Sequence, residues 1–156
     1  MYITNTITNI CLLLITIMSL LSCSGQRPTN LGITNNKFLA CPASPNCVSS
    51  DASDDPHKVL AIKFNVLAND AWQITKQTVV KLPRTQIVSE TPDYLHAECT
   101  STVFGFVDDL ELHLRLSDGI IAIRSASRLG HSDFGVNRER VETLRVLLIK
   151  QGINLM

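Results

Sequence analysis

The stretch Val107–Leu116 constrains the fold most, because apolar and polar residues alternate along it from Asp109 onward. Its leucines are Leu110, Leu112, Leu114 and Leu116, and the residues beside them are Asp109, Glu111, His113 and Arg115. Successive side chains of a β-strand point to opposite faces, so this pattern predicts a strand with one buried face and one polar face. Asp118-Gly119 is a two-residue hairpin signal, and Ile120–Arg128 is the predicted returning strand.

A hairpin loop made only of Asp118 and Gly119 would fix the pairing of the two strands, because Ser117 then faces Ile120. The predicted pairs on the two faces are Leu114 with Ile123, Leu116 with Ile121, Asp109 with Arg128, and His113 with Arg124. The same register places Ser125 and Ser127 opposite Leu112 and Leu110, on the face that helices cover. A slip of one residue would turn every side chain to the other face.

The remaining elements complete an α+β domain. The period of the sequence predicts strands over Lys58–Phe64, Thr85–Ser89 and Tyr94–Val103, a helix that begins after Asn69 or Asp70 and ends at Pro83, and a last helix from Asn137 to Gly152. The order β-α-β-β-β-β-α predicts an antiparallel sheet of about five strands with two helices packed on one face.

The N-terminal segment has the pattern of a signal peptide. Residues 1–22 carry no charged side chain, and the apolar run Ile10–Leu21 is too short to span a bilayer comfortably. Leu20-Leu21-Ser22-Cys23 resembles a bacterial lipobox, in which cleavage leaves Cys23 as the lipid-carrying N-terminus. The alternatives are an uncleaved anchor helix and a plain secretory signal, because residues 1–9 lack the usual basic side chain.

Residues 23–40 are predicted to be a lipidated tether, since glycine, proline and asparagine are frequent in them and apolar residues are few. Residues 41–156 are then a single domain. Lipidation at Cys23 would make the membrane a partner of the chain and place it in the bacterial envelope, facing the periplasm. Ser24 follows the cysteine where an aspartate would retain the protein in the inner membrane, so the outer membrane is favoured.

Cysteines in an oxidising compartment form lasting disulfides. Cys41 and Cys47 flank a turn-forming stretch with two prolines and are the candidate disulfide, whereas Cys99 is predicted to be a buried small hydrophobe. A zinc site is not indicated, because no second pair of cysteine or histidine ligands accompanies the first. Trp72 is predicted to lie in the core and His57 in a loop.

Three stretches resemble the bacterial and plastid proteins of domain of unknown function 1499 (DUF1499). They are Cys41–Ser50 (CPASPNCVSS), Phe104–Glu111 (FGFVDDLE) and Arg124–Val141 (RSASRLGHSDFGVNRERV). The similarity extends over about Leu31 to Ile149. It implies a family but no mechanism, because the family has no established activity.

The chemistry must therefore come from the residues themselves. Arginine forks suit carboxylate or phosphate groups, and a glycine-rich turn leading into a helix near Asn137 would add backbone N–H donors, so an anion site is one interpretation. The candidate ligand-binding residues are Asp108, Asp109, Glu111, Arg124, Ser125, Ser127, Arg128, Asp133, Asn137 and Arg138. The alternative is structural: Arg124 and Arg128 pair with Asp108, Asp109 or Glu111, while Asp133 and Asn137 cap turns and a helix.

We expect a non-enzymatic protein that binds a small anionic or amphipathic ligand, or an envelope partner. A hydrolase or isomerase built on Asp108, Asp109, Arg124 and Arg128 is the first alternative, and a structural envelope factor is the second. Strand alternation sets Asp108 on the face opposite Asp109, which argues against a metal site, and no cofactor is expected. Nucleic acid is not an expected partner, since 14 basic and 14 acidic residues balance.

Overall fold

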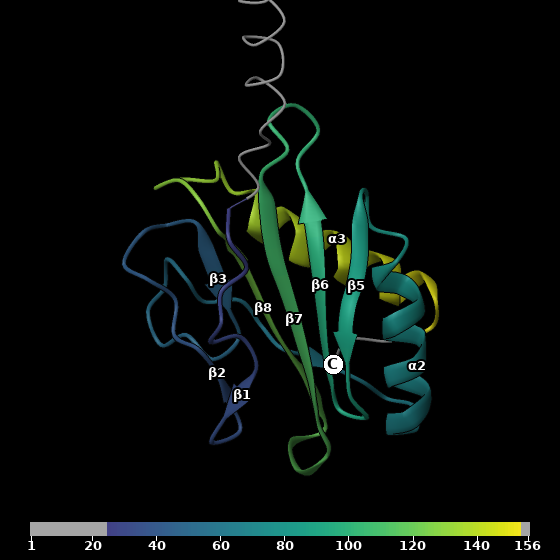
Figure 1. Cartoon of the computed structure of the whole chain (residues 1–156). Helices are drawn as coiled ribbons and strands as arrows, with labels where there is room; N and C mark the ends of the chain where they lie inside the picture. The colour runs from purple at the N-terminus through teal and green to yellow at the C-terminus, as the bar shows by residue number, and fades with distance from the viewer. Residues whose placement is uncertain (1–24, 154–156) are drawn as a thin grey trace, which may run out of the picture.

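A computed structural model describes residues 25–153 (Figure 1). The predicted signal peptide, the lipobox and Cys23 lie outside the described residues. Within residues 25–153, no helix combines the length and the apolar character needed to cross a membrane.

The main sheet is antiparallel and has six strands, which confirms the predicted α+β class. Its order is β3 (Cys47–Ser49), β8 (Ile120–Ser127), β7 (Val107–Arg115), β6 (Tyr94–Thr100) and β5 (Thr85–Glu90), with β4 (Ile62–Lys63) paired to the far end of β8. Helices α2 (Ala68–Val79) and α3 (Val136–Lys150) pack on one side of this sheet (Figure 1).

The β7–β8 hairpin differs from its predicted register by two residues. Its loop has four residues rather than two, because Leu116–Asp118 form the 3-10 turn η1 and Gly119 closes it at φ 62°. Glu111 therefore lies opposite Arg124, Leu112 opposite Ile123, and Asp109 opposite Ala126. An even shift returns each side chain to its predicted face, so the division between the two faces is confirmed although the pairs are not.

Short strands and element ends account for the other differences. The strand predicted over Lys58–Phe64 is reduced to β4, and β6 ends at Thr100 rather than Val103. Helix α2 begins at Ala68, ahead of both predicted caps, and its N-cap residue Leu67 makes no side-chain capping bond. Strand β3 was not predicted, since three residues are too few to show a period.

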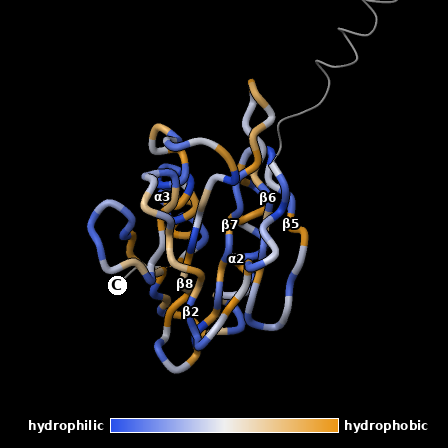
Figure 2. The backbone as a smooth tube through the Cα atoms, turned by 60° about the vertical axis from the view of Figure 1, so that its left-hand side comes forward, coloured by the Kyte–Doolittle hydropathy of each residue, from blue (hydrophilic) through white to orange (hydrophobic). Residues whose placement is uncertain are grey.

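The apolar face of the sheet and the two helices enclose the core. Apolar and polar residues alternate along β7 (Figure 2), and Leu110, Leu112 and Leu114 contribute the core side of that strand. Trp72 of α2 is 2% exposed, as predicted, and Leu144 and Leu148 of α3 are fully buried. These side chains join the sheet and both helices in one hydrophobic cluster.

The opposite face of the sheet is covered by the start of the described chain. The short hairpin of β1 (Ile33–Thr34) and β2 (Lys37–Phe38) lies to the left of β8 and β7 in Figure 1. The Gly32 amide donates to Glu111 of β7 at 2.8 Å, and the buried ring of Phe38 lies edge-on to His113 at 6.4 Å. Residues 25–40, expected to be part of a tether, thus contact the domain along this face.

Candidate functional site

The polar face of the sheet carries a dense set of charged side chains. Alternation along β6 and β7 directs them there, and Arg124 of β8 and Arg128, just beyond it, add the basic partners. The set, called here the charged face, consists of Tyr94, His96, Glu98, Asp109, Glu111, His113, Arg115, Arg124 and Arg128. Most of these side chains are buried, because residues 25–40 lie over them.

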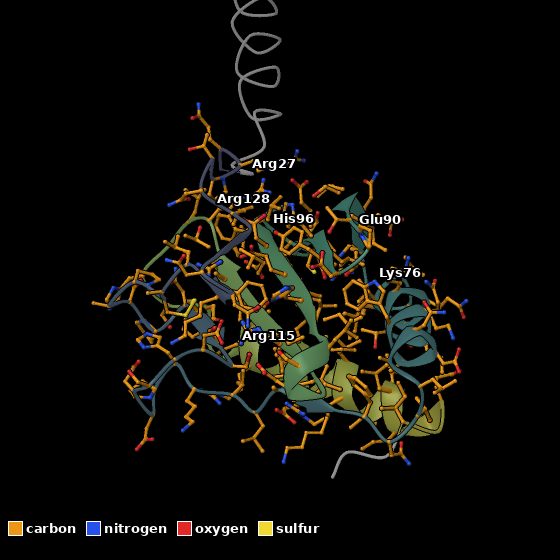
Figure 3. All side chains as sticks on the ribbon, turned by 90° about the horizontal axis from the view of Figure 1, so that it is seen from below. Arg27, Lys76, Glu90, His96, Arg115 and Arg128 are labelled. Carbon is orange, nitrogen blue, oxygen red and sulfur yellow. A yellow bond between two sulfur atoms is a disulfide. The ribbon has the colours of Figure 1, made fainter. Side chains whose placement is uncertain are left out.

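A continuous chain of hydrogen bonds begins at His96. Its Nε2 lies 2.7 Å from Asp109 Oδ1, and Arg128 donates to both oxygens of Asp109, from Nε at 2.9 Å and from Nη2 at 2.6 Å. Arg128 Nη2 also donates to Glu98 Oε1 at 2.5 Å, and Arg27 Nε donates to the same oxygen at 2.7 Å. Figure 3 shows Arg27, Arg128 and His96 close together at this end of the sheet.

Glu111 forms the centre of the charged face and is fully buried. Its Oε2 accepts from Arg124 Nη1 at 2.8 Å, and its Oε1 accepts from the Tyr94 hydroxyl and the Gly32 amide, each at 2.8 Å. The carboxylate thereby joins three strands and the N-terminal segment. Arg124 Nε is buried and has no partner among the described residues.

Arg115 connects the other end of the charged face to the loop after β3. It donates to both oxygens of Asp51, at 2.8 and 2.7 Å, and its guanidinium carbon lies 5.8 Å from the centre of the Phe38 ring. Asp51 Oδ2 also accepts from the Phe38 amide at 3.0 Å. A bidentate ion pair of this kind fixes geometry as well as charge.

The pairing decides the ionisation of these acids. Burial alone would raise the pKa of Asp109 and of Glu98, but hydrogen bonds from His96 and Arg128 to the first, and from Arg128 and Arg27 to the second, lower both pKa values overall. The same balance lowers the pKa of Asp51, which Arg115 and the Phe38 amide bind. Burial, together with the neighbouring Glu111 charge, raises the pKa of Tyr94.

A second polar cluster lies on the helix side of the sheet. Asp108 accepts from Arg140 Nη2 at 2.6 Å, and Arg140 Nη1 donates to Ser125 Oγ at 3.0 Å and to Asn137 Oδ1 at 2.6 Å. Asn137 Nδ2 donates to Ser127 Oγ at 2.9 Å. The predicted placement of both serines under the helices is therefore confirmed.

The side chain of Asp133 caps the turn before α3. Asp133 accepts from the Asn137 amide at 2.8 Å and from the Gly135 amide at 3.0 Å. Arg138, in contrast, is directed away from both clusters and donates to the carbonyl oxygens of Pro56 and Lys58. The structure thus separates the ten candidate residues into two clusters on opposite faces, with Arg138 in neither.

This separation bears on two of the alternatives. Asp108 lies across the sheet from Asp109, Arg124 and Arg128, so the four residues suggested for a hydrolase or isomerase do not form one site. The structural alternative predicted that Arg124 and Arg128 pair with Asp108, Asp109 or Glu111. In the structure Arg128 pairs with Asp109 and Arg124 with Glu111, whereas Asp108 pairs with Arg140.

Sequence analysis missed His96, Glu98 and the pairing role of Arg140. The first two alternate with Leu95, Ala97 and Cys99 along β6, a signal that identified the strand but not its partners. Among the described residues, His96, Glu98 and Asp109 form one group whose ligand atoms lie within 4.8 Å of one another. Arg128 already donates to both carboxylates, so a cation at this place would meet a guanidinium.

A pocket of about 370 Å³ opens where the ends of β5 and β6 approach the start of α3. Its walls combine aliphatic side chains, hydroxyls and a few charged groups. They are Leu82, Pro83, Arg84, Cys99, Thr100, Ser101, Thr102, Val136, Glu139, Arg140 and Thr143. Through Arg140 the pocket connects to the helix-side cluster around Asp108.

The predictions for the cysteines are confirmed within the described residues. Cys41 and Cys47 form a disulfide with their Cα atoms 5.6 Å apart. Cys99 is a free, buried thiol whose pKa is raised by burial. His57 lies in a turn, as predicted, and its Nδ1 contacts Asp54 while its Nε2 lies 3.2 Å from the Ser44 carbonyl oxygen.

Comparison with known proteins identifies a family without an assigned role. The sequence profile described as "Protein of unknown function (DUF1499)" matches residues 37–148. No curated protein matches the chain. The matched region contains both polar clusters, the disulfide and the pocket, and covers well over half of the sequence, so the chain belongs to the DUF1499 family.

Proposed function

We propose that this chain is a lipid-anchored protein of the bacterial cell envelope whose domain binds a small amphipathic ligand without converting it chemically. The lipobox-like Leu20-Leu21-Ser22-Cys23 supports the anchor. The pocket beside α3 is the observation that carries the binding function. Its volume of about 370 Å³ lies within the range of small-molecule sites, which are mostly apolar with a few placed polar groups.

The pocket fits an amphipathic anion because it offers apolar walls and a basic group. Leu82, Pro83 and Val136 supply aliphatic surface. Arg84 donates from Nε to the Thr100 carbonyl oxygen at 2.8 Å, and its two terminal nitrogens have no partner among the described residues. Those nitrogens are suited to a carboxylate, phosphate or sulfonate group.

The backbone at Arg84 supports the same assignment. Its φ of 48° lies in the left-handed region, which non-glycine residues rarely adopt. Strained conformations of this kind concentrate at ligand sites, where the surrounding structure holds them in place. Arg140 also lines the pocket, but Asp108, Ser125 and Asn137 already bind its terminal nitrogens.

We assign the charged face a structural role in this proposal. Arg124 is paired with Glu111 and Arg128 with Asp109 and Glu98, so neither guanidinium is available to an external anion. The carboxylates of the charged face bind the N-terminal segment instead: Glu111 accepts from the Gly32 amide and Glu98 accepts from Arg27. An envelope protein whose charges only stabilise its fold is therefore the second candidate.

The binding function is tested with 8-anilinonaphthalene-1-sulfonate, a fluorescent probe with an apolar body and one anionic group. Val136→Trp fills the pocket, and Val146→Trp, at a similarly exposed position of α3 that does not line the pocket, is its control. We expect Val136→Trp to weaken probe binding about tenfold, equivalent to about 1.4 kcal/mol, and Val146→Trp to leave it unchanged. Equal affinity in the two variants would remove the support for the pocket.

The anchor is tested on the full-length chain expressed in a bacterium. Cys23→Ser should release the protein from the membrane fraction and remove the mass of the attached lipid, whereas Cys11→Ser, in the apolar run, should change neither. A Cys23→Ser protein that stays in the membrane with an unprocessed N-terminus would indicate an uncleaved anchor helix instead.

A further inference from the structure

Two loops at one end of the sheet expose large apolar side chains. The β6–β7 loop, residues 101–106, and the β8–α3 loop, residues 128–135, both lie at the upper end in Figure 1. Their exposed apolar residues, called here the apolar end, are Val103, Phe104, Phe106, Leu129 and Phe134. Phe134 is 96% exposed and Phe104 70%. Clusters of exposed apolar residues mark contact sites for other molecules.

Hydrogen-bonded turns hold these side chains in the solvent. In the first loop, the Phe106 amide donates to Ser101 Oγ at 2.9 Å, the Ser101 amide donates to the Phe106 carbonyl at 2.8 Å, and the Phe104 and Phe106 rings lie 5.6 Å apart. In the second, Phe134 has a φ of 54°, a left-handed conformation that is unfavourable for a bulky residue. The rings are therefore presented by ordered backbone.

The described chain begins beside the apolar end. Gly25 packs so closely there that a Cβ on it would lie 3.1 Å from Leu129 Cγ and 3.0 Å from Arg128 Cβ. Cys23 precedes Gly25 by two residues, a distance that an extended chain spans in about 7 Å. The backbone of Cys23 can thus lie no more than about 7 Å from this packed position, so a lipid on Cys23 is attached close to the apolar end. Such a short link cannot hold the domain far from the membrane.

We propose that the apolar end lies on the phospholipid bilayer and inserts its phenylalanine and valine side chains into the interface. The proposal rests on the lipid anchor of the proposed function, because the anchor position determines which end of the domain faces the membrane. Apolar side chains at the level of the headgroups add to the binding that lipidation provides. Ser101, Thr102 and Val136 border the pocket at the same end, so this contact brings the pocket to the bilayer.

The test places a tryptophan at each end of the full-length, membrane-extracted protein. Phe104→Trp reports on the apolar end, and Leu116→Trp reports on the η1 turn at the opposite end of the hairpin, where Leu116 is 69% exposed. Trp72 is buried and contributes the same background to both. Each variant is reconstituted in phosphatidylethanolamine–phosphatidylglycerol vesicles whose acyl chains carry bromine, which quenches tryptophan fluorescence on contact.

We expect several-fold stronger quenching in Phe104→Trp than in Leu116→Trp. Equal quenching of the two variants overturns the proposal. A second copy of the chain that covers the rings would give this result, because the rings would then not contact lipid. The mass of each preparation reports lipidation separately. Equal quenching of a lipidated chain rejects the membrane contact and leaves the anchor intact, whereas selective quenching of an unlipidated chain rejects the anchor and supports the contact.

Discussion

The two faces of the central sheet are both buried, but different interactions hold them. Leu112 and Glu111 are neighbours on β7, and each is 0% exposed. Leu112 points into an apolar core under the helices. Glu111 points the other way, where three donors from separate parts of the chain bind its two oxygens.

The difference shows what each face demands of the sequence. Apolar contacts are non-directional, so the helix side tolerates changes that keep volume and hydrophobicity. A buried carboxylate must instead be matched by donors, since an unpaired charge in the interior is strongly unfavourable. The charged face therefore specifies one position for the N-terminal segment, which a purely apolar face would not do.

Breaking the central ion pair gives the largest expected effect. Arg124→Met leaves Glu111 buried without its cationic partner and should lower the free energy of unfolding by about 3 to 5 kcal/mol. Urea denaturation followed by Trp72 fluorescence measures this. Glu111→Leu combined with Arg124→Met removes both charges and should recover part of the loss. Recovery stays incomplete because the Tyr94 hydroxyl and the Gly32 amide lose their acceptor. If Arg124→Met lowers the free energy of unfolding by less than about 1 kcal/mol, as the loss of an exposed ion pair would, the charged face is not tightly held.

Truncation on the helix side should be somewhat less costly. Leu112→Ala creates a cavity in the core, next to Ile123 on β8, and should lower the free energy of unfolding by about 3 kcal/mol. Leu112→Met, which nearly conserves volume, is the control and should cost less than about 1.5 kcal/mol. Equal losses in Leu112→Ala and Leu112→Met would show that this position tolerates no change of side-chain shape, even when volume is conserved. The helix side would then be as strict as the charged face.

The sequence predicted this division of faces well and the details of pairing poorly. Alternation alone assigned Leu112 inward and Glu111 to the polar side, because period two is a property of every strand. The register could not be predicted from alternation, because Leu116 fits the alternating pattern although it belongs to the 3-10 turn and not to β7. The Arg128–Asp109 pair is present despite the shifted register, because a long side chain reaches along the strand to a diagonal neighbour.

The covering of the charged face could not be predicted. Residues 25–40 have the composition of a linker, and β1 and β2 have only two residues each, which is too short to show a period. What fixes them is a set of single contacts with distant residues, such as Gly32 with Glu111. The burial of the charges, and therefore their pairing role, depends on those contacts.

Acid should weaken the charged face selectively. Despite burial, hydrogen bonds lower the pKa values of Asp51, Glu98 and Asp109; they come from Arg115 to Asp51, from Arg128 and Arg27 to Glu98, and from His96 and Arg128 to Asp109. The unfolded chain therefore binds protons more readily than the folded one. The stability they contribute is complete above the unfolded carboxyl pKa of about 4 and is lost as the pH falls through the lower folded values. We expect the free energy of unfolding, measured by urea denaturation, to fall below pH 4. Its slope should be up to about 1.4 kcal/mol per pH unit for each proton that unfolding takes up. Asp109→Asn should flatten this dependence, whereas Leu112→Ala should leave its slope unchanged.

The smallest effect comes from the ion pair at the edge of the charged face, and it tests how the N-terminal segment is held. Arg27 is mostly exposed and pairs with Glu98 at 2.6 Å, while Lys76 pairs with Glu90 at 3.7 Å on the helix side (Figure 3). Replacing either cation by alanine should change the free energy of unfolding by less than about 1 kcal/mol. Hydrogen exchange separates the two: Arg27→Ala should speed exchange of the Gly32 amide, which donates to Glu111, by allowing residues 25–32 to open locally. Lys76→Ala should leave that amide unchanged. Unaltered protection in both variants would mean that Phe38 and Gly32 hold the segment without Arg27, and that the charged face needs only its buried pairs.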